Sequence, residues 1–297
     1  MEASAYSPSA PAGVDKTRLW IGGVSVPVLR SGPADAREAV LFLHGNPGSG
    51  ADWHDLLAST GEFARAVAPD MPGFGHADKP RDFRYDLTGY ADFIQGLLSE
   101  LGIERVHLVV HDLGGPWALE WAGRDPSRVA SIVEINTGVL IRYRWHVLAR
   151  IWQTPVLGEV FQATATRPMF RLLTNRGQKR KLPRAYLDHL YDENFTRPTR
   201  RVILKYYRAT RDAAGIAARQ AAAVVQHDIP ALVLWGARDP YLGIELAEAQ
   251  REAFPSARIV VFEDSGHWPF VDDPERTAGV IVPFLREQVG RGGEESR

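Results

Sequence analysis

The stretch Val109-Val110-His111-Asp112-Leu113-Gly114-Gly115 is an apolar strand that runs into a tight, glycine-containing turn. Such a pattern predicts a sharp strand-to-helix turn that exposes the side chain at residue 112. A carboxylate in that position can attack saturated, electrophilic carbon and form an alkyl ester. The aspartate therefore favours covalent chemistry on carbon over ordinary ester hydrolysis.

Apolar strands and helical patterns alternate along most of the chain, which predicts right-handed crossovers and a mostly parallel sheet. Eight strands are expected within 17–21, 24–30, 39–45, 65–70, 105–112, 130–136, 231–239 and 257–267, and helices at 85–101, 116–123 and 274–289. The strand pattern is absent between 140 and 226, where helical stretches at 142–152, 185–195 and 201–225 indicate an inserted helical cap. We expect a flexible N-terminus (1–16), an α/β core (17–139 and 227–290), this cap (140–226) and a flexible tail (291–297).

The composition is that of a soluble protein with a sizeable core, since 45% of the 297 residues are hydrophobic and 24% are charged. A net charge of −1 predicts no general attraction to nucleic acid or to an anionic membrane. The absence of cysteine excludes disulfides, thiolate metal ligands and a cysteine nucleophile. We find no signal-peptide pattern, no apolar run of ~18 residues and no metal-ligand spacing. The sequence predicts a cytoplasmic monomer or homodimer without cofactor or metal.

Three candidate catalytic side chains follow strands of the predicted sheet: Asp112, Asp239 and His267. Because the carboxyl ends of parallel strands meet at one edge, we expect these groups to lie together. Asp112 is already an anion at neutral pH and needs no base to attack. His267, oriented by Asp239, would instead activate the water that cleaves the ester, which is worth about 10²–10⁴-fold.

Hydrolysis of such an ester passes through an oxyanion, which needs hydrogen-bond donors. The backbone N–H of Leu113 is one expected donor, and the N–H of Asn46 in the loop after the strand at 39–45 is the second. The side chain of Asn46 is an alternative ligand for a leaving group.

Five segments carry a specific resemblance: His44-Gly45-Asn46-Pro47, the loop at 69–80, the elbow at 111–122, Trp235–Pro240 and Ser265–Phe270. Their order resembles that of the α/β-hydrolase superfamily from Thr17 to Val289, and Asp112 resembles the nucleophile of its epoxide hydrolase and haloalkane dehalogenase branches. The resemblance implies an α/β-hydrolase fold with an inserted cap and a triad of Asp112, Asp239 and His267. Some dehalogenases take the acid from the end of the preceding strand, where this chain has Asn136.

The two branches differ in how they assist the leaving group. The haloalkane dehalogenases that this chain resembles have tryptophan directly after the nucleophile, where this chain has Leu113. Asn46 fits their second halide donor. An epoxide hydrolase uses two cap tyrosines, and Tyr207 matches one of them. No tyrosine occurs near 156–162, where the other is expected; Tyr143 and Tyr191 are the possible substitutes.

We therefore expect a cofactor-independent hydrolase that opens an epoxide on a small apolar substrate to a vicinal diol. The alternatives are a haloalkane dehalogenase, or a non-catalytic ligand receptor on the same scaffold. For Tyr207, packing in the core is an alternative to acid catalysis. The basic residues between 176 and 184 are interpreted as a solvated face of the cap.

Overall fold

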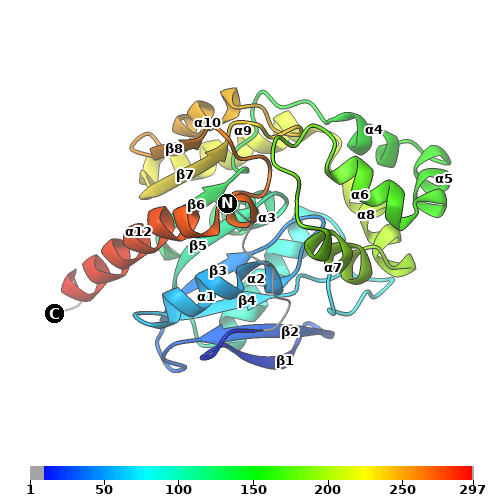
Figure 1. Ribbon diagram of the computed structural model, residues 1–297. Coiled ribbons are helices and arrows are strands. Elements are labelled where there is room, and N and C mark those ends of the chain that lie inside the picture. Colours follow the sequence, from blue (N-terminus) through cyan, green and yellow to red (C-terminus); the bar gives the residue numbers. More distant parts are fainter. Residues whose placement is uncertain (1–9, 296–297) are drawn as a thin grey trace.

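The computed structural model describes residues 10–295, and side chains up to Arg291, around an eight-stranded sheet (Figure 1). The strand order is β1-β2-β4-β3-β5-β6-β7-β8; the first three strands pair antiparallel, and the pairs from β4 to β8 are parallel. The strands are β1 Asp15–Ile21, β2 Val24–Ser31, β3 Glu38–Leu43, β4 Arg65–Pro69, β5 Arg105–His111, β6 Val129–Ile135, β7 Ala231–Gly236 and β8 Arg258–Phe262.

Twelve α-helices are found in the described part of the chain. They are α1 His54–Gly61, α2 Leu87–Glu100, α3 Gly114–Ala122, α4 Val147–Gln153, α5 Leu157–Thr164, α6 Arg167–Thr174, α7 Arg184–Asn194, α8 Arg197–Ala209, α9 Ala213–Val224, α10 Glu245–Ala249, α11 Pro269–Asp272 and α12 Pro274–Glu295.

Alternate side chains of each central strand enter two separate hydrophobic layers, because successive residues of a strand point to opposite faces. In β3, Val40 and Phe42 pack with α1 and α12, whereas Leu41 and Leu43 pack with α2, α3 and α9. The sheet is therefore covered by helices on both faces, which explains why its strands are almost continuously apolar.

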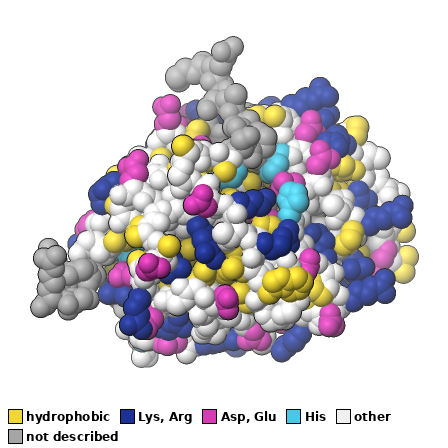
Figure 2. Space-filling view, turned by 90° about the horizontal axis from the view of Figure 1, so that it is seen from below, with side chains coloured by type: hydrophobic (Ala, Val, Ile, Leu, Met, Phe, Trp, Pro, Cys, Tyr) yellow, Lys and Arg dark blue, Asp and Glu magenta, His cyan; other side chains and the backbone are white. Residues whose placement is uncertain are grey.

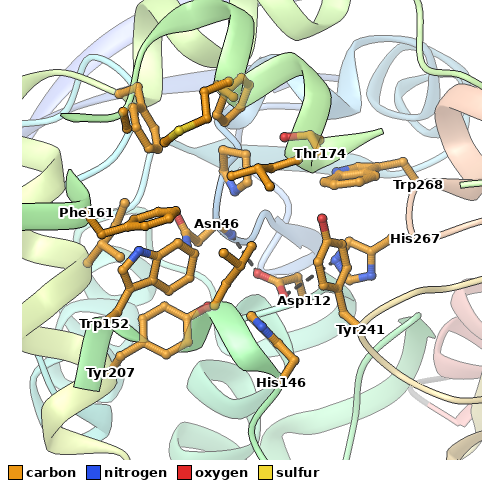
Figure 3. Close-up of a pocket in the computed structure, with 18 residues that line it drawn as sticks. Asn46, Asp112, His146, Trp152, Phe161, Thr174, Tyr207, Tyr241, His267 and Trp268 are labelled. Atoms are coloured by element: carbon orange, nitrogen blue, oxygen red, sulfur yellow. Dashed lines mark hydrogen bonds and ion pairs between the residues drawn. The ribbon is translucent and has the colours of Figure 1, made fainter. Parts of the chain in front are cut away.

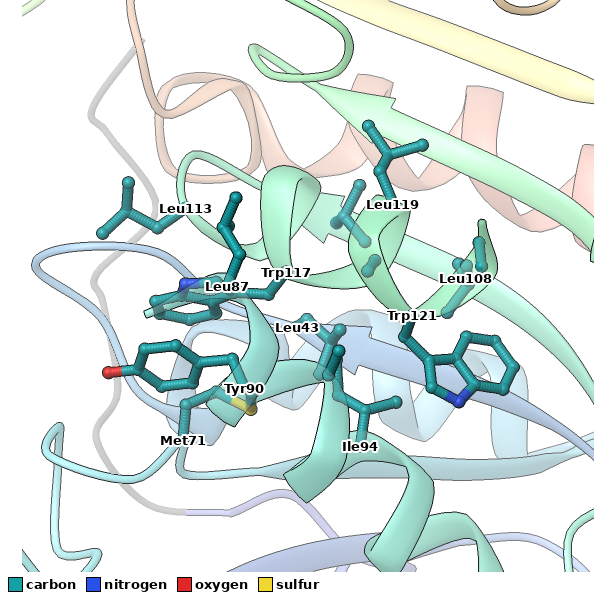
Figure 4. Close-up of a cluster of buried hydrophobic side chains, with 14 of the residues drawn as sticks. Leu43, Met71, Leu87, Tyr90, Ile94, Leu108, Leu113, Trp117, Leu119 and Trp121 are labelled. Atoms are coloured by element: carbon teal, nitrogen blue, oxygen red, sulfur yellow. The ribbon is translucent and has the colours of Figure 1, made fainter. Parts of the chain in front are cut away.

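The layer formed by α2 and α3 supports the turn after β5 (Figure 4). Tyr90 of α2 stacks on Trp117 of α3 with ring centroids 4.2 Å apart. The side chain of Leu113 is buried in the same cluster. Asp86 caps α2 by accepting a hydrogen bond from the backbone N–H of Gly89. The residues on either side of Asp112 are thus fixed by packing.

Helices α4 to α8 form the cap, which lies to the right of the sheet in Figure 1. Helix α9 differs from them because it packs against α3 of the core, where Gln220 donates a hydrogen bond to the carbonyl of Pro116 (2.9 Å). The predicted helical stretch at 201–225 is divided at Thr210 into α8 and α9. The side chain of Asp212 explains the new start, since it accepts from Gly215 N–H and caps α9.

The predicted mostly parallel eight-stranded sheet with flanking helices is confirmed. Strand β1 begins at Asp15, two residues before the expected core, and α12 continues to Glu295 within the expected tail. The predictions of a flexible N-terminus and a flexible tail also cover residues 1–9 and 296–297, which lie outside the described residues. Between residues 10 and 295, no helix is both long and apolar enough to cross a membrane.

Candidate active site

Asp112 lies at the sharp turn between β5 and α3, where its φ of +47° is a conformation that L residues rarely adopt. Two glycines make room for this turn. A Cβ at Gly45 would lie 2.3 Å from the Cβ of Asp112, and one at Gly115 would lie 2.2 Å from Oγ1 of Thr137. Thr137 also donates a hydrogen bond to the backbone carbonyl of Asp112 (2.5 Å). The backbone of Asp112 is therefore held from both sides.

The carboxylate of Asp112 has one partner for each oxygen. The backbone N–H of Asn46 donates to Oδ1 at 2.7 Å, and Nε2 of His267 lies 3.5 Å from Oδ2. Burial alone would raise the pKa of Asp112, but the interaction with His267 and the N–H of Asn46 outweigh it and hold the pKa below its usual value. Asp112 is thus an anion at neutral pH.

His267 lies in the loop after β8 and bridges the two aspartates. Its Nδ1 is 2.6 Å from Oδ2 of Asp239, while its Nε2 faces Asp112. Burial acts to lower the pKa of His267, but the negative charges of Asp239 and Asp112 raise it above its usual value. Behind the ring, His111 donates its Nε2–H to the backbone carbonyl of His267 at 2.8 Å. The structure thus brings Asp112, Asp239 and His267 together, as the sequence predicts.

Asp239 is fixed by donors on both of its oxygens. Oδ1 accepts from the backbone N–H groups of Tyr241 (2.7 Å) and Leu242 (3.0 Å). Oδ2 accepts from His267 and from Nδ2 of Asn136 (2.8 Å). Asn136 has a φ of +43° at the end of β6, and its Oδ1 accepts from Gly236 N–H. Asn136 therefore supports the acid rather than replacing it.

A cavity of roughly 680 Å³, partly open to solvent, separates Asp112 from the cap (Figure 3). The apolar part of its wall comes mainly from the cap: Leu148, Trp152, Phe161, Ala165, Met169, Phe170, Leu173, Phe195 and Ile203. Polar groups gather around Asp112: Asn46, His146, Tyr207, Tyr241 and His267, with Thr174 on the cap. No lysine or arginine is among the described residues that line the cavity. The cavity therefore fits a neutral, apolar compound with one reactive polar end.

Tyr207 projects from α8 into this cavity with its hydroxyl toward Asp112 (Figure 3). Its ring packs between Trp145 and Trp152, with centroids 5.0 and 4.8 Å away. Burial and the negative charge of Asp112 raise the pKa of Tyr207, while a hydrogen bond with the side chain of Asn46 acts in the opposite direction. The phenol is therefore protonated and positioned by Asn46.

Leu113, Tyr143 and Tyr191 are not among the residues that line the cavity. The isobutyl group of Leu113 is buried in the core, so only its backbone N–H could act at the site. The hydroxyl of Tyr143 accepts from the backbone N–H of His146 (3.4 Å), and that of Tyr191 accepts from Arg200 (3.4 Å). Neither tyrosine replaces the second phenol.

The cavity residues that were not foreseen from the sequence include His146, Trp152 and Tyr241. His146 caps α4 through Nδ1, which accepts the backbone N–H of Ala149 (3.2 Å). Nε1 of Trp152 is buried and has no hydrogen-bond partner in the described part of the chain. Tyr241 had a signal in the sequence, since it follows Asp239 by two residues; His146 and Trp152 reach the site only through packing of the cap.

Within the described residues, no group of three His, Cys, Asp or Glu side chains could hold a metal ion. The arrangement combines a buried, ionised carboxylate, a histidine–aspartate pair beside it, and the protonated phenol of Tyr207 in the same cavity. Such a site can form an ester on Asp112 and then hydrolyse it.

Comparison with known proteins places this geometry in a family. The sequence model for the alpha/beta hydrolase fold matches residues 38–274. A cis-3-alkyl-4-alkyloxetan-2-one decarboxylase of Xanthomonas campestris is 31% identical over 289 residues, which cover 89% of this chain and 92% of that protein.

Two solved structures share the fold. Haloalkane dehalogenase DatA from Agrobacterium tumefaciens has a TM-score of 0.80 and 21% identity, with 93% of this chain and 98% of that one covered. Epoxide hydrolase CorEH has a TM-score of 0.75 and 17% identity, with 92% and 98% covered. At these identities the likeness shows the fold alone. Together with the family match, it establishes that the chain belongs to the α/β-hydrolase fold family.

Proposed function

We propose that this protein opens an epoxide on a neutral, apolar compound through a covalent ester on Asp112. One observation carries the proposal: the Asp112 carboxylate faces a cavity in which a protonated, buried phenol, that of Tyr207, points toward it. An epoxide needs both groups, because attack on ring carbon leaves an alkoxide that must be protonated. The absence of Lys and Arg from the described cavity lining disfavours acids, including haloacids, as substrates.

In the first step, Oδ2 of Asp112 attacks a ring carbon while Oδ1 stays bound to the N–H of Asn46. A carbon–oxygen bond forms to the carboxylate, and the carbon–oxygen bond of the ring breaks. The proton of Tyr207 moves to the departing oxygen, which gives a hydroxyalkyl ester and a phenolate that regains a proton later. The raised pKa keeps the proton on the phenol until the ring opens, and the phenol can then protonate the alkoxide because the alkoxide is the stronger base.

His146 would act as the second proton donor, for which the sequence has no tyrosine near residues 156–162. Because its Nδ1 accepts the N–H of Ala149, a neutral ring carries its proton on Nε2. Burial lowers the pKa of His146 to about 4, against the negative charge of Asp112, so the ring is neutral at pH 7. Figure 3 shows the imidazole and the phenol of Tyr207 on the same side of Asp112. Two donors would then share the developing charge.

In the second step, His267 acts as a general base. Esterification removes the charge of Asp112, which is one of the interactions that raise the pKa of His267. The neutral imidazole, oriented by Asp239, can then take a proton from a water that attacks the ester carbonyl. The N–H of Asn46, together with that of Leu113, would stabilise the resulting oxyanion. Collapse of the tetrahedral intermediate releases the diol and restores the Asp112 carboxylate.

A second candidate, haloalkane dehalogenation, is favoured by Trp152. Its indole N–H is buried in the wall of the same cavity without a partner among the described residues, and Asn46 offers a side-chain amide there. Two such donors could hold a departing halide. The relative that acts on oxetan-2-ones supports the first candidate instead, because those compounds are also strained oxygen rings.

Turnover of three shape-matched apolar compounds separates these functions: a terminal epoxide, a primary bromoalkane and a dialkyl oxetan-2-one. We expect diol from the epoxide, and no product from the Asp112→Ala variant. Bromide release without diol would establish the dehalogenase, and an alkene from the oxetanone would establish decarboxylation. Tight binding of all three without turnover would instead support a receptor.

A further inference from the structure

The cap and the core carry opposite charges, which the net charge of −1 conceals. Residues 140–211, which contain α4 to α8, hold 16 Lys and Arg against 4 Asp and Glu, a net charge of +12. The remainder of the chain has a net charge of −13. At the end of the molecule formed by the cap, Figure 2 shows basic side chains interspersed with hydrophobic ones. A charge separation of this size creates a strong field around the cap.

Several of these basic side chains have no acidic partner among residues 10–295, although Lys181 donates hydrogen bonds to the backbone carbonyls of Asn175 and Gln178. Arg150, Arg176 and Lys181 are exposed, and none of them pairs with a carboxylate of residues 10–295. None of them lines the cavity either, so they do not serve to bind the substrate at the nucleophile.

Helices α4, α5 and α6, with the residue before α5, carry large apolar side chains both in the cavity and on the surface. Their inner face supplies Leu148, Trp152, Phe161, Met169 and Leu173 to the cavity. Five further apolar side chains are 50–73% exposed and are called the outer face here: Val147, Val156, Leu157, Val160 and Leu172. A helix that is apolar on both faces needs a partner on each of them. The cavity accounts for one of these faces, and no part of the chain between residues 10 and 295 covers the other.

We infer that the outer face of α4–α6 docks onto an anionic lipid surface. Apolar side chains flanked by lysine and arginine are the combination that binds at the boundary between headgroups and acyl chains. A second copy of the chain fits less well, because a symmetric contact through this face would bring two caps of net charge +12 together. Nucleic acid would leave the exposed valines and leucines without a partner.

Docking in this orientation would place the apolar wall of the cavity close to the lipid surface. The same three helices separate the lipid surface from the apolar wall of the cavity. An apolar compound dissolved in the lipid would therefore reach the cavity by crossing the cap alone. The binding surface itself does not depend on which reaction Asp112 performs.

Flotation with lipid vesicles tests this inference. The full-length protein is mixed with phosphatidylcholine vesicles, or with vesicles that contain 30 mol% phosphatidylglycerol, at low and at physiological salt. We expect co-flotation with the anionic vesicles and little with the neutral ones. Each basic residue near the surface should contribute about fivefold at low salt, so Arg150→Glu/Arg176→Glu/Lys181→Glu should abolish the preference for anionic lipid.

Removal of the apolar contacts is the second arm. Leu157→Ser/Val160→Ser/Leu172→Ser should weaken binding about tenfold or more. The matched control is Trp20→Ser, which removes an equally exposed apolar side chain (69%) from β1 at the edge of the sheet. Because none of these residues lines the cavity, unchanged turnover and melting temperature verify folding.

Three results would overturn the inference: no flotation with anionic vesicles, equal flotation of the triple serine variant, or equal loss in Trp20→Ser. A dimer in sedimentation velocity that the triple serine variant abolishes would assign the face to a second copy instead.

Discussion

At the scale of single residues, the charge of Asp112 is set by its neighbours. A carboxylate buried to this extent would become neutral on its own, yet His267 and the N–H of Asn46 keep it ionised. The same contacts orient it, because each oxygen has a separate partner. Aspartate at this turn is thus both ionised and held in a fixed orientation, at a backbone φ of +47° that packing must maintain.

Tyr207→Phe should separate the two steps of the reaction. It removes the phenolic proton without changing the packing against Trp145 and Trp152. Ester formation in single-turnover kinetics should slow by about 10²-fold, while hydrolysis of the ester keeps its rate. Equal slowing of both steps, or of neither, would remove Tyr207 from the role of acid.

Glu134→Gln should change the dependence of stability on pH. Glu134 is fully buried in β6, neither carboxylate oxygen has a partner in the described residues, and burial raises its pKa. The unfolded chain loses this proton first, so folding stability falls as pH rises above about 4.5, by up to about 1.4 kcal/mol per pH unit. The melting temperature of the variant, relative to that of the wild type, should therefore increase between pH 5 and pH 8. Parallel profiles would show that Glu134 ionises in the folded protein.

The sequence predicts residues that follow strands better than residues that come from the cap. Asp112, Asp239 and His267 could be found because a parallel sheet brings the ends of its strands together. His146 and Trp152 could not, because their place depends on how α4 packs over the cavity. Tyr207 could be named only because its segment resembles that of a known family. For Asn46 the sequence offered two roles, and the structure leaves both open: its backbone N–H faces Asp112 and its side chain contacts Tyr207.

At the scale of elements, helix α4 couples the cap to the chemistry. His146 is at once the N-cap of this helix and a wall of the cavity. Its Nδ1 serves the helix, which leaves Nε2 for the substrate. A single side chain therefore fixes both the start of the helix and the position of a donor.

His146→Asn separates these two roles. Asparagine is a good N-cap and can accept from Ala149, but its side chain is too short to reach the substrate. Ester formation should slow about tenfold at an unchanged melting temperature, since Tyr207 remains. His146→Ala should also lose the cap, worth about 1 kcal/mol. A wild-type rate in the asparagine variant would show that His146 only caps the helix.

Element boundaries were predictable where the pattern is strong. The eight strands match their predicted positions because each is a short apolar run ending in a turn. In the cap, α5 and α6 were missed, and α8 and α9 were expected as one helix. Both differences arise from short polar and proline-containing breaks, whose effect depends on tertiary packing.

At the scale of the whole molecule, the site exists only where two parts of the chain meet. In the proposed mechanism, the core supplies the nucleophile, base and acid, whereas the cap supplies the proton donors and the apolar wall. The segregation of charge between these parts is invisible in the overall composition, although it can be counted from the sequence once the boundaries of the cap are known.

The intact mass of a His267→Ala variant after incubation with an apolar epoxide tests the central claim most directly. Without its base, the ester on Asp112 should accumulate, so the protein should gain the mass of one whole epoxide. The Asp112→Ala/His267→Ala double variant is the control and should gain nothing. If the wild type forms diol but the His267→Ala variant gains no mass, the reaction does not pass through an ester on Asp112, and the account is contradicted.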